Sequence, residues 1–219
     1  MSDLYRTSEV RWFFSGEVTP AVTEWFLQTL PGGLRGGALK RQDVYLLVPG
    51  RDDVGLKFRR DKIQLKLRRN RRPFSALGGR VLGVQTDWER HSWTYDQAAE
   101  DLARAFSGEA GLGRQVAVAK TRRQKTYGLG REGDPHPLAA GKRVKTPVLL
   151  ELTEIAFAGF LGWSLGLEIV GPQSQAQGHL LPAVAGLLRD FPALPLKQCD
   201  SLDYPEFIWR QVHPADHTG

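Results

Sequence analysis

The chain of 219 residues is long enough for one large domain or two small ones, and its 41% hydrophobic and 25% charged residues are typical of a soluble globular protein. Thirty Lys and Arg against 24 Asp and Glu give a net charge of +6, which favours anionic partners such as phosphates, nucleic acid or an acidic surface. The single cysteine, Cys199, excludes an intramolecular disulfide and a cysteine-based zinc site, and no apolar run approaches the ~20 residues of a membrane-spanning helix. We therefore expect a cytosolic protein without a membrane partner.

Short β-strands recur along the chain, because apolar and polar residues alternate with period two. The predicted strands cover residues 9–15, 43–48, 55–59, 63–68, 80–93, 114–127, 148–159 and 163–171, with a turn at residues 60–62. Residues 68–74, which are rich in arginine, are predicted to form a loop.

Helices are predicted in the gaps between strands and at the end of the chain. Thr19 is suited to cap a helix with Pro20 in its first turn. A second helix is expected over residues 96–106 and a third from Ser174 onward, followed by a short closing helix or turn over residues 200–209.

The hairpin over residues 55–68 places cations on one face of two neighbouring strands. Lys57, Arg59, Lys66 and Arg68 alternate with apolar residues, so their side chains share a side of the sheet. That side needs water or anions, because a buried unpaired charge is very unfavourable. Charged residues facing one side recur on later strands as well.

These patterns predict an α+β protein, with residues 1–219 forming a single domain. The connections between the roughly eight strands are mostly hairpins, so the sheet should be antiparallel. A flat sheet with one wet face could present the repeated inward charges. A closed or nearly closed β-tunnel flanked by helices does so while also removing the sheet edges, and we favour it.

Several short motifs match only by letter. Residues 128–133 fit G-x-G-x-x-G, but the DPHP that follows is a poor start for the helix that a dinucleotide site requires. The histidines lack HExxH spacing and no G-x-S-x-G motif is present. The basic segments 68–73 and 120–125 fit either nucleic-acid patches or solvated loops, and loops are favoured.

The order of motifs over about residues 8–208 resembles the CYTH superfamily of triphosphate tunnel metalloenzymes. The family's basic strand is similar to residues 56–59, and its next strand, with an inward Lys, to residues 64–66. Its K-x-R strand is similar to residues 120–122 and its two late acidic strands to residues 150–153 and 167–169. Its closing Ser-Tyr segment is similar to residues 201–207.

The resemblance implies an antiparallel eight-stranded tunnel that holds a triphosphate and divalent metal. It implies phosphate binding by inward basic residues, which here are Lys57, Arg59, Lys66, Lys120 and Arg122. It also implies Mg²⁺ or Mn²⁺ held by inward acids, for which Glu9, Glu151 and Glu168 are the candidates, with Asp87 and Glu89 as further ones.

The chain departs from the family at the metal site. The family opens with E-x-E-x-K, whereas Arg11 and Phe13 follow Glu9 here. Gly166 stands in place of the acid that should accompany Glu168, and Thr153 stands where a second acid is expected near Glu151. Arg11 places a positive charge where a metal ion would bind, so the basic residues expected to bind phosphate are better retained than the acidic residues expected to bind metal.

Two functions of different classes remain open. One is a metal-dependent triphosphatase, because phosphoryl transfer needs chiefly positioning and charge neutralisation. The other is a tunnel that binds a triphosphate, polyphosphate or other anionic phosphorylated ligand with weak or altered catalysis, or that pairs its charges internally. The broken first motif favours the second. A module that binds protein or nucleic acid through outer basic loops is a third reading.

Overall fold

The computed structural model describes residues 3–34, 36–59, 62–94, 114–138, 142 and 144–213. Its nine strands are β1 (Asp3–Ser15), β2 (Leu39–Leu47), β3 (Val54–Arg59), β4 (Lys62–Ala76), β5 (Val81–Thr94), β6 (Arg114–Leu129), β7 (Pro135–Pro137), β8 (Val148–Phe157) and β9 (Phe160–Val170). The predicted helix over residues 96–106 and the first two residues of the predicted turn at 60–62 lie outside the described residues, and Lys62 belongs to β4 rather than to a turn.

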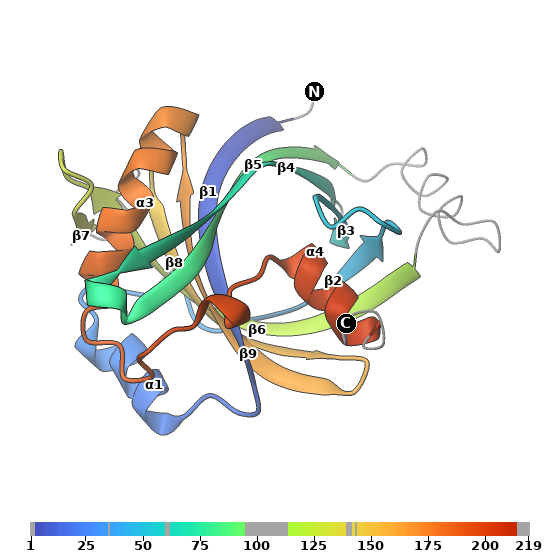
Figure 1. The fold of residues 1–219 in the computed structure, drawn as a ribbon, viewed down its shortest axis with the longest axis horizontal. Helices are drawn as coiled ribbons and strands as arrows, with labels where there is room; N and C mark the ends of the chain where they lie inside the picture. The colour runs from blue at the N-terminus through green and yellow to red at the C-terminus, as the bar shows by residue number, and fades with distance from the viewer. Residues whose placement is uncertain are drawn as a thin grey trace.

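Eight of these strands form a closed antiparallel barrel, as the sequence predicted. Their order is β2-β3-β4-β5-β1-β9-β8-β6, and β6 pairs back to β2 from Leu39↔Arg122 to Leu47↔Arg114. The short strand β7, which was not predicted, lies outside the barrel on β6. Figure 1 shows the strands curving round a common interior.

The predicted loop over residues 68–74 is wrong, because β4 runs through this segment to Ala76. A register shift between Arg68 and Asn70 bends β4 against β5, in the manner of a β-bulge. Beyond Arg68, whose backbone N–H still donates to Asp53 at 2.8 Å, β4 pairs with β5 alone among the described strands. Pro73, which has no N–H to donate, is tolerated in such a one-sided stretch.

Helices cover the outside of the barrel on one flank. Thr19 caps α1 (Pro20–Glu24), as predicted, and a π-helical turn, η1 (Trp25–Thr29), continues it. The helix α3 (Gln173–Leu187) lies along β1 and β9 (Figure 1). Their apolar residues form one core with the outer faces of β1, β8 and β9, which includes Trp12, Trp25, Leu165 and Leu180. No helix in the described part of the chain has the length and apolarity that crossing a membrane would need.

The end of the chain closes one end of the barrel. After the short turns η2 (Leu77–Gly79) and η3 (Gln198–Asp200), α4 (Tyr204–Val212) lies beside β2 and β3 (Figure 1). Phe207 stacks on the inward ring of Phe13 with 3.8 Å between ring centroids. The apolar side chains that fill this end are Phe13, Tyr45, Leu47, Val116, Val118, Ile155, Phe157, Phe207 and Ile208.

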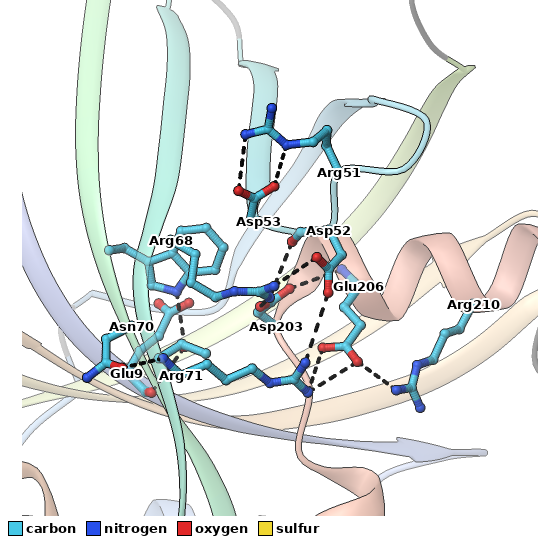
Figure 2. A network of polar contacts seen from close by, with 12 residues as sticks. Glu9, Arg51, Asp52, Asp53, Arg68, Asn70, Arg71, Asp203, Glu206 and Arg210 are labelled. Atoms are coloured by element: carbon cyan, nitrogen blue, oxygen red, sulfur yellow. Dashed lines mark hydrogen bonds and ion pairs between the residues drawn. The ribbon is translucent and has the colours of Figure 1, made fainter.

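Ion pairs from β4 hold the beginning of α4 in place. Asp203 caps α4 by accepting from the backbone N–H of Glu206 at 3.0 Å, and Arg68 reaches Asp203 at 2.8 Å. Arg71 contacts Glu206 at 2.9 Å, and Glu206 also accepts from Arg210. Figure 2 shows the two β4 arginines pointing toward these carboxylates. Arg68, expected among the cations of the binding face, therefore serves to fix α4.

Asp203→Ala should lower the free energy of unfolding by about 1–3 kcal/mol, because the cap of α4 and a buried partner of Arg68 are lost together. Urea denaturation at pH 8 tests this, since burial raises the pKa of Asp203 to about 6 and the carboxyl is ionised at pH 8. Asp190→Ala, at an exposed turn, is the control and should change stability by less than about 0.5 kcal/mol. Equal effects of the two substitutions would contradict the role given to Asp203.

Candidate functional site

A polar cavity of about 120 Å³ lies inside the barrel. Its wall carries three glutamates together with the aromatic side chains of Tyr45, Trp88 and Tyr204. The basic residues that line it are Arg11, Arg41, Lys57, Arg59, Lys66, Arg90, Lys120 and Arg122. Cations thus outnumber carboxylates on the described wall.

The structure brings together the residues that the sequence singled out. All five predicted phosphate-binding residues, on β3, β4 and β6, line this cavity. So do the predicted metal ligands Glu9, Glu151 and Glu168, on β1, β8 and β9. Their convergence follows from strand alternation, because residues of one parity on each barrel strand face the interior.

Asp87 and Glu89 lie elsewhere, since β5 turns the opposite parity inward, with Trp88 and Arg90 on the cavity wall. Asp87 is buried under α3, where it accepts from Ser8 at 2.7 Å and from Gln177 at 2.8 Å. Glu89 pairs with Arg69 and His91. The two carboxylates therefore support the outer layers of the molecule and are not brought to the three glutamates.

A buried carboxylate, Asp43, gathers four of the cations. It lies 2.8 Å from Arg59, 3.3 Å from Lys120, 3.5 Å from Arg41 and 3.8 Å from Lys57. Burial alone would raise the pKa of Asp43, but these cations lower it below its usual range. A single carboxylate thus faces four basic side chains.

The lysines of this cluster titrate at unusually low pH. Burial and the neighbouring guanidinium groups lower the pKa of Lys57 to about 7, although Asp43 acts in the opposite direction. Burial likewise lowers the pKa of Lys120 well below its usual value. Lys120 also donates to the Tyr45 hydroxyl at 2.6 Å, and its Nζ lies 3.4 Å from the centre of the Tyr204 ring. An anion placed among these groups would favour their charged forms.

The three glutamates are each engaged by cations of the protein. Lys66 Nζ lies 2.9 Å from Glu9 and 3.8 Å from Glu168. Glu151 receives Arg11 at 3.0 Å and Arg122 at 2.8 Å. Burial acts to raise the pKa of Glu151, but Arg11, Arg122 and Arg41 lower it to about 2, so this carboxylate stays ionised.

These donors do not fit the divalent metal that the family resemblance implies. No group of three or more His, Cys, Asp or Glu in the described part of the chain is arranged to hold a metal ion. A divalent ion bound by Glu151 would lie near the guanidinium of Arg11. At 4 Å and an effective dielectric constant of about 20, one such charge opposes a divalent ion by about 8 kcal/mol.

Arg41 and Arg90 are cavity residues that the sequence did not reveal. The predicted strand began at residue 43, so Arg41 fell outside it, whereas β2 begins at Leu39. Arg90 follows Thr86 and Trp88 at a spacing of two residues, so strand alternation would have placed it on the same face of the sheet. The buried Nε and Nη1 of Arg41 and Nε of Arg90 have no hydrogen-bond partner. Donors of this kind are normally satisfied, by protein, solvent or ligand.

The basic segments proposed as outer loops are strands whose charges are largely paired. Arg69 contacts Glu89, and Arg72 contacts Asp87. On β6, Arg123 pairs with Glu154 while Lys125 donates to the backbone carbonyl of Leu30. These pairs reduce the positive charge that the described part of the chain offers to a nucleic acid.

No protein-family model matches the chain, and no curated protein matches it significantly.

Proposed function

We propose that the barrel interior binds a compact anionic ligand, namely a triphosphate, a polyphosphate or another phosphorylated molecule. In this proposal the chain is a divergent relative of the CYTH tunnel proteins whose catalysis is weak or altered. Lys57, Arg59, Lys66, Lys120 and Arg122 would bind the phosphates, and Arg41 and Arg90 would join them.

The observation that carries the proposal is the excess of inward positive charge over the carboxylates that face it. Asp43 and the three glutamates stand against eight basic side chains. Three guanidinium nitrogens of Arg41 and Arg90 make no hydrogen bond, and Lys57 comes no closer than 3.8 Å to a carboxylate among the described ion pairs. Phosphate oxygens supply both the charge and the acceptors that these groups lack.

The volume of the cavity favours a small ligand. Pockets for organic ligands of drug size usually measure about 300–1,000 Å³. The cavity here, at about 120 Å³, has room for a short inorganic phosphate chain rather than for a nucleotide base beside it.

Calorimetric titration with inorganic triphosphate tests the proposal, with Lys57→Met as the informative variant. Its affinity should fall about 10- to 100-fold, because one charge-assisted hydrogen bond of about 1.5–3 kcal/mol is removed. Folding should not suffer, since Lys57 is a poorly paired buried cation. Lys40→Met removes the same charge from an exposed neighbour of Arg41 and should leave the affinity unchanged.

Phosphate release measured on the same samples separates binding from hydrolysis. Binding with no release supports an anion receptor. Sustained release that is lost in Glu168→Ala would establish the triphosphatase instead. An absence of binding heat with the wild-type protein would contradict both functions.

A further inference from the structure

The two departures from the family pattern at Arg11 and Gly166 face each other across one strand pair. Arg11 of β1 is the register partner of Gly166 of β9. A Cβ atom added to Gly166 would collide with Arg11 Cζ and would lie 2.5 Å from its Nη2. The backbone of Gly166 has no positive φ that would call for glycine. The absent side chain therefore provides the space that the guanidinium fills.

Contacts from three elements fix the guanidinium in that space. Arg11 Nη2 donates to Glu151 on β8 at 3.0 Å, and Nη1 donates to Ser164 on β9 at 3.1 Å. The ring of Tyr204, at the start of α4, lies 4.9 Å from Arg11 Cζ. Only 6% of the residue is exposed to solvent. Arg11 is thus a buried cation in a defined position on the cavity wall.

The same arrangement occupies the carboxylates that a metal would require. Arg11 and Arg122 take the two oxygens of Glu151, and Lys66 lies between Glu9 and Glu168. A metal ion would have to displace these cations and leave them in a cavity that already holds a surplus of positive charge. The protein itself supplies the charge that a divalent ion would bring.

We propose that the guanidinium of Arg11 takes the place of the divalent cation, so that the cavity binds the metal-free form of an inorganic oligophosphate. This inference rests on the proposed function and adds to it the form of the ligand. Mg²⁺ should weaken binding, because it withdraws the free anion into a complex of lower negative charge that the cationic wall attracts less.

Titration of sodium tripolyphosphate in EDTA and again in excess MgCl₂ tests the inference on the wild-type protein. We expect binding in EDTA and an apparent affinity at least 10-fold weaker in MgCl₂. Binding that requires Mg²⁺ would overturn the inference and leave the proposed function standing. An absence of binding under both conditions would overturn the proposed function as well.

Two substitutions locate the effect at Arg11. Arg11→Glu should weaken binding in EDTA at least 10-fold and reverse the response, so that MgCl₂ strengthens binding. Gly166→Ala introduces the Cβ atom that collides with the guanidinium, and should weaken binding in EDTA several-fold in a protein whose circular dichroism is unchanged. Gly178→Ala, where nothing lies within 4 Å of the added atom, is the control and should bind as the wild type does. Wild-type affinity and wild-type Mg²⁺ response in Gly166→Ala would overturn the assignment to Arg11.

Discussion

Asp43→Asn should lower the free energy of unfolding by about 3–5 kcal/mol, the range expected when a buried ion pair loses one partner. The substitution keeps the shape of the side chain and removes the one charge that faces Arg41, Lys57, Arg59 and Lys120. Asp43 is fully buried, so bulk water does not reach the position of the carboxylate to solvate the cations in its place. Urea denaturation at pH 7 in a buffer without phosphate measures the difference.

Asp53→Asn provides the matched control for this substitution. Asp53 lies 2.7 Å from Arg51, a pair at least as short as those of Asp43, but both side chains are about half exposed. Exposed pairs contribute little, so the loss should stay below about 1 kcal/mol. Similar losses in the two variants would show that burial does not determine how much the charge of Asp43 contributes to the free energy of unfolding.

Inorganic triphosphate should restore stability to Asp43→Asn more than it adds to the wild-type protein. A bound anion would return the negative charge to the same four cations, and a ligand stabilises the folded state more when it binds that state more tightly. Equal shifts in Tm for the two proteins would argue that the anion binds away from this cluster.

Through Lys57 alone, the affinity for triphosphate should fall by up to about 10-fold for each pH unit above 7. Free Lys57, with its pKa near 7, is half neutral at pH 7, and a bound anion raises that pKa toward its usual value of 10.5. Binding between these two values therefore takes up a proton, which becomes scarcer as the pH rises. Lys120, whose pKa is lowered as well, acts in the same direction.

Calorimetry in two buffers of different ionisation enthalpy counts the protons taken up. We expect uptake of about one proton or more at pH 8 for the wild-type protein and less for Lys57→Met. Protons that the triphosphate itself gains or loses contribute equally to both measurements, so they cancel when the uptake by Lys57→Met is subtracted from that by the wild-type protein. Identical proton uptake by both proteins would contradict the assignment to Lys57.

The stability of the ligand-free protein should change with pH in the opposite sense. The pKa of Lys57 is lower in the folded state than in the unfolded chain, so the unfolded chain binds more protons between pH 7 and 10.5. This group therefore makes the protein more stable as the pH rises through that window, by at most about 1.4 kcal/mol per pH unit. Lys57→Met should flatten this part of the profile.

Strand alternation was enough to predict part of the cationic interior from the sequence. In the predicted hairpin, Lys57 and Lys66 alternate with apolar residues on the two strands, which places both on its cationic face. On β6, alternation left a basic residue on each face, and the resemblance to the K-x-R strand of the family selected Lys120 and Arg122. The barrel was predictable for a related reason, since repeated inward charge favours a closed sheet. Glu9, Glu151 and Glu168 depended on the family resemblance in addition.

Alternation failed on β5, where both faces are covered. Asp87 and Glu89 share one parity and Trp88 and Arg90 the other, and polar residues occur on each. The sequence alone cannot show whether Asp87 is buried beneath α3 or inside the barrel. In both places a buried polar side chain needs hydrogen-bond partners, and these lie far away along the chain. The partner of Asp87 on α3, Gln177, is 90 residues distant.

The pairing of Arg11 with Gly166 was hidden for the same reason. Each was visible in the sequence as a separate loss of an acidic residue, 155 positions apart. Only the register of β1 on β9 shows that they are complementary changes, one adding a cation and the other removing the side chain that would block it.

The apolar plug formed by α4 makes the barrel interior a blind tube. In the described part of the chain, Phe207 stacks on Phe13 and shares with Ile208 the apolar cluster that fills this end of the interior, which leaves a polymer no passage through that end. A long polyphosphate could enter only by a terminus and would have to leave by the opening it entered. Its binding would then be counted per chain end rather than per phosphate, and any action on it would be distributive rather than processive.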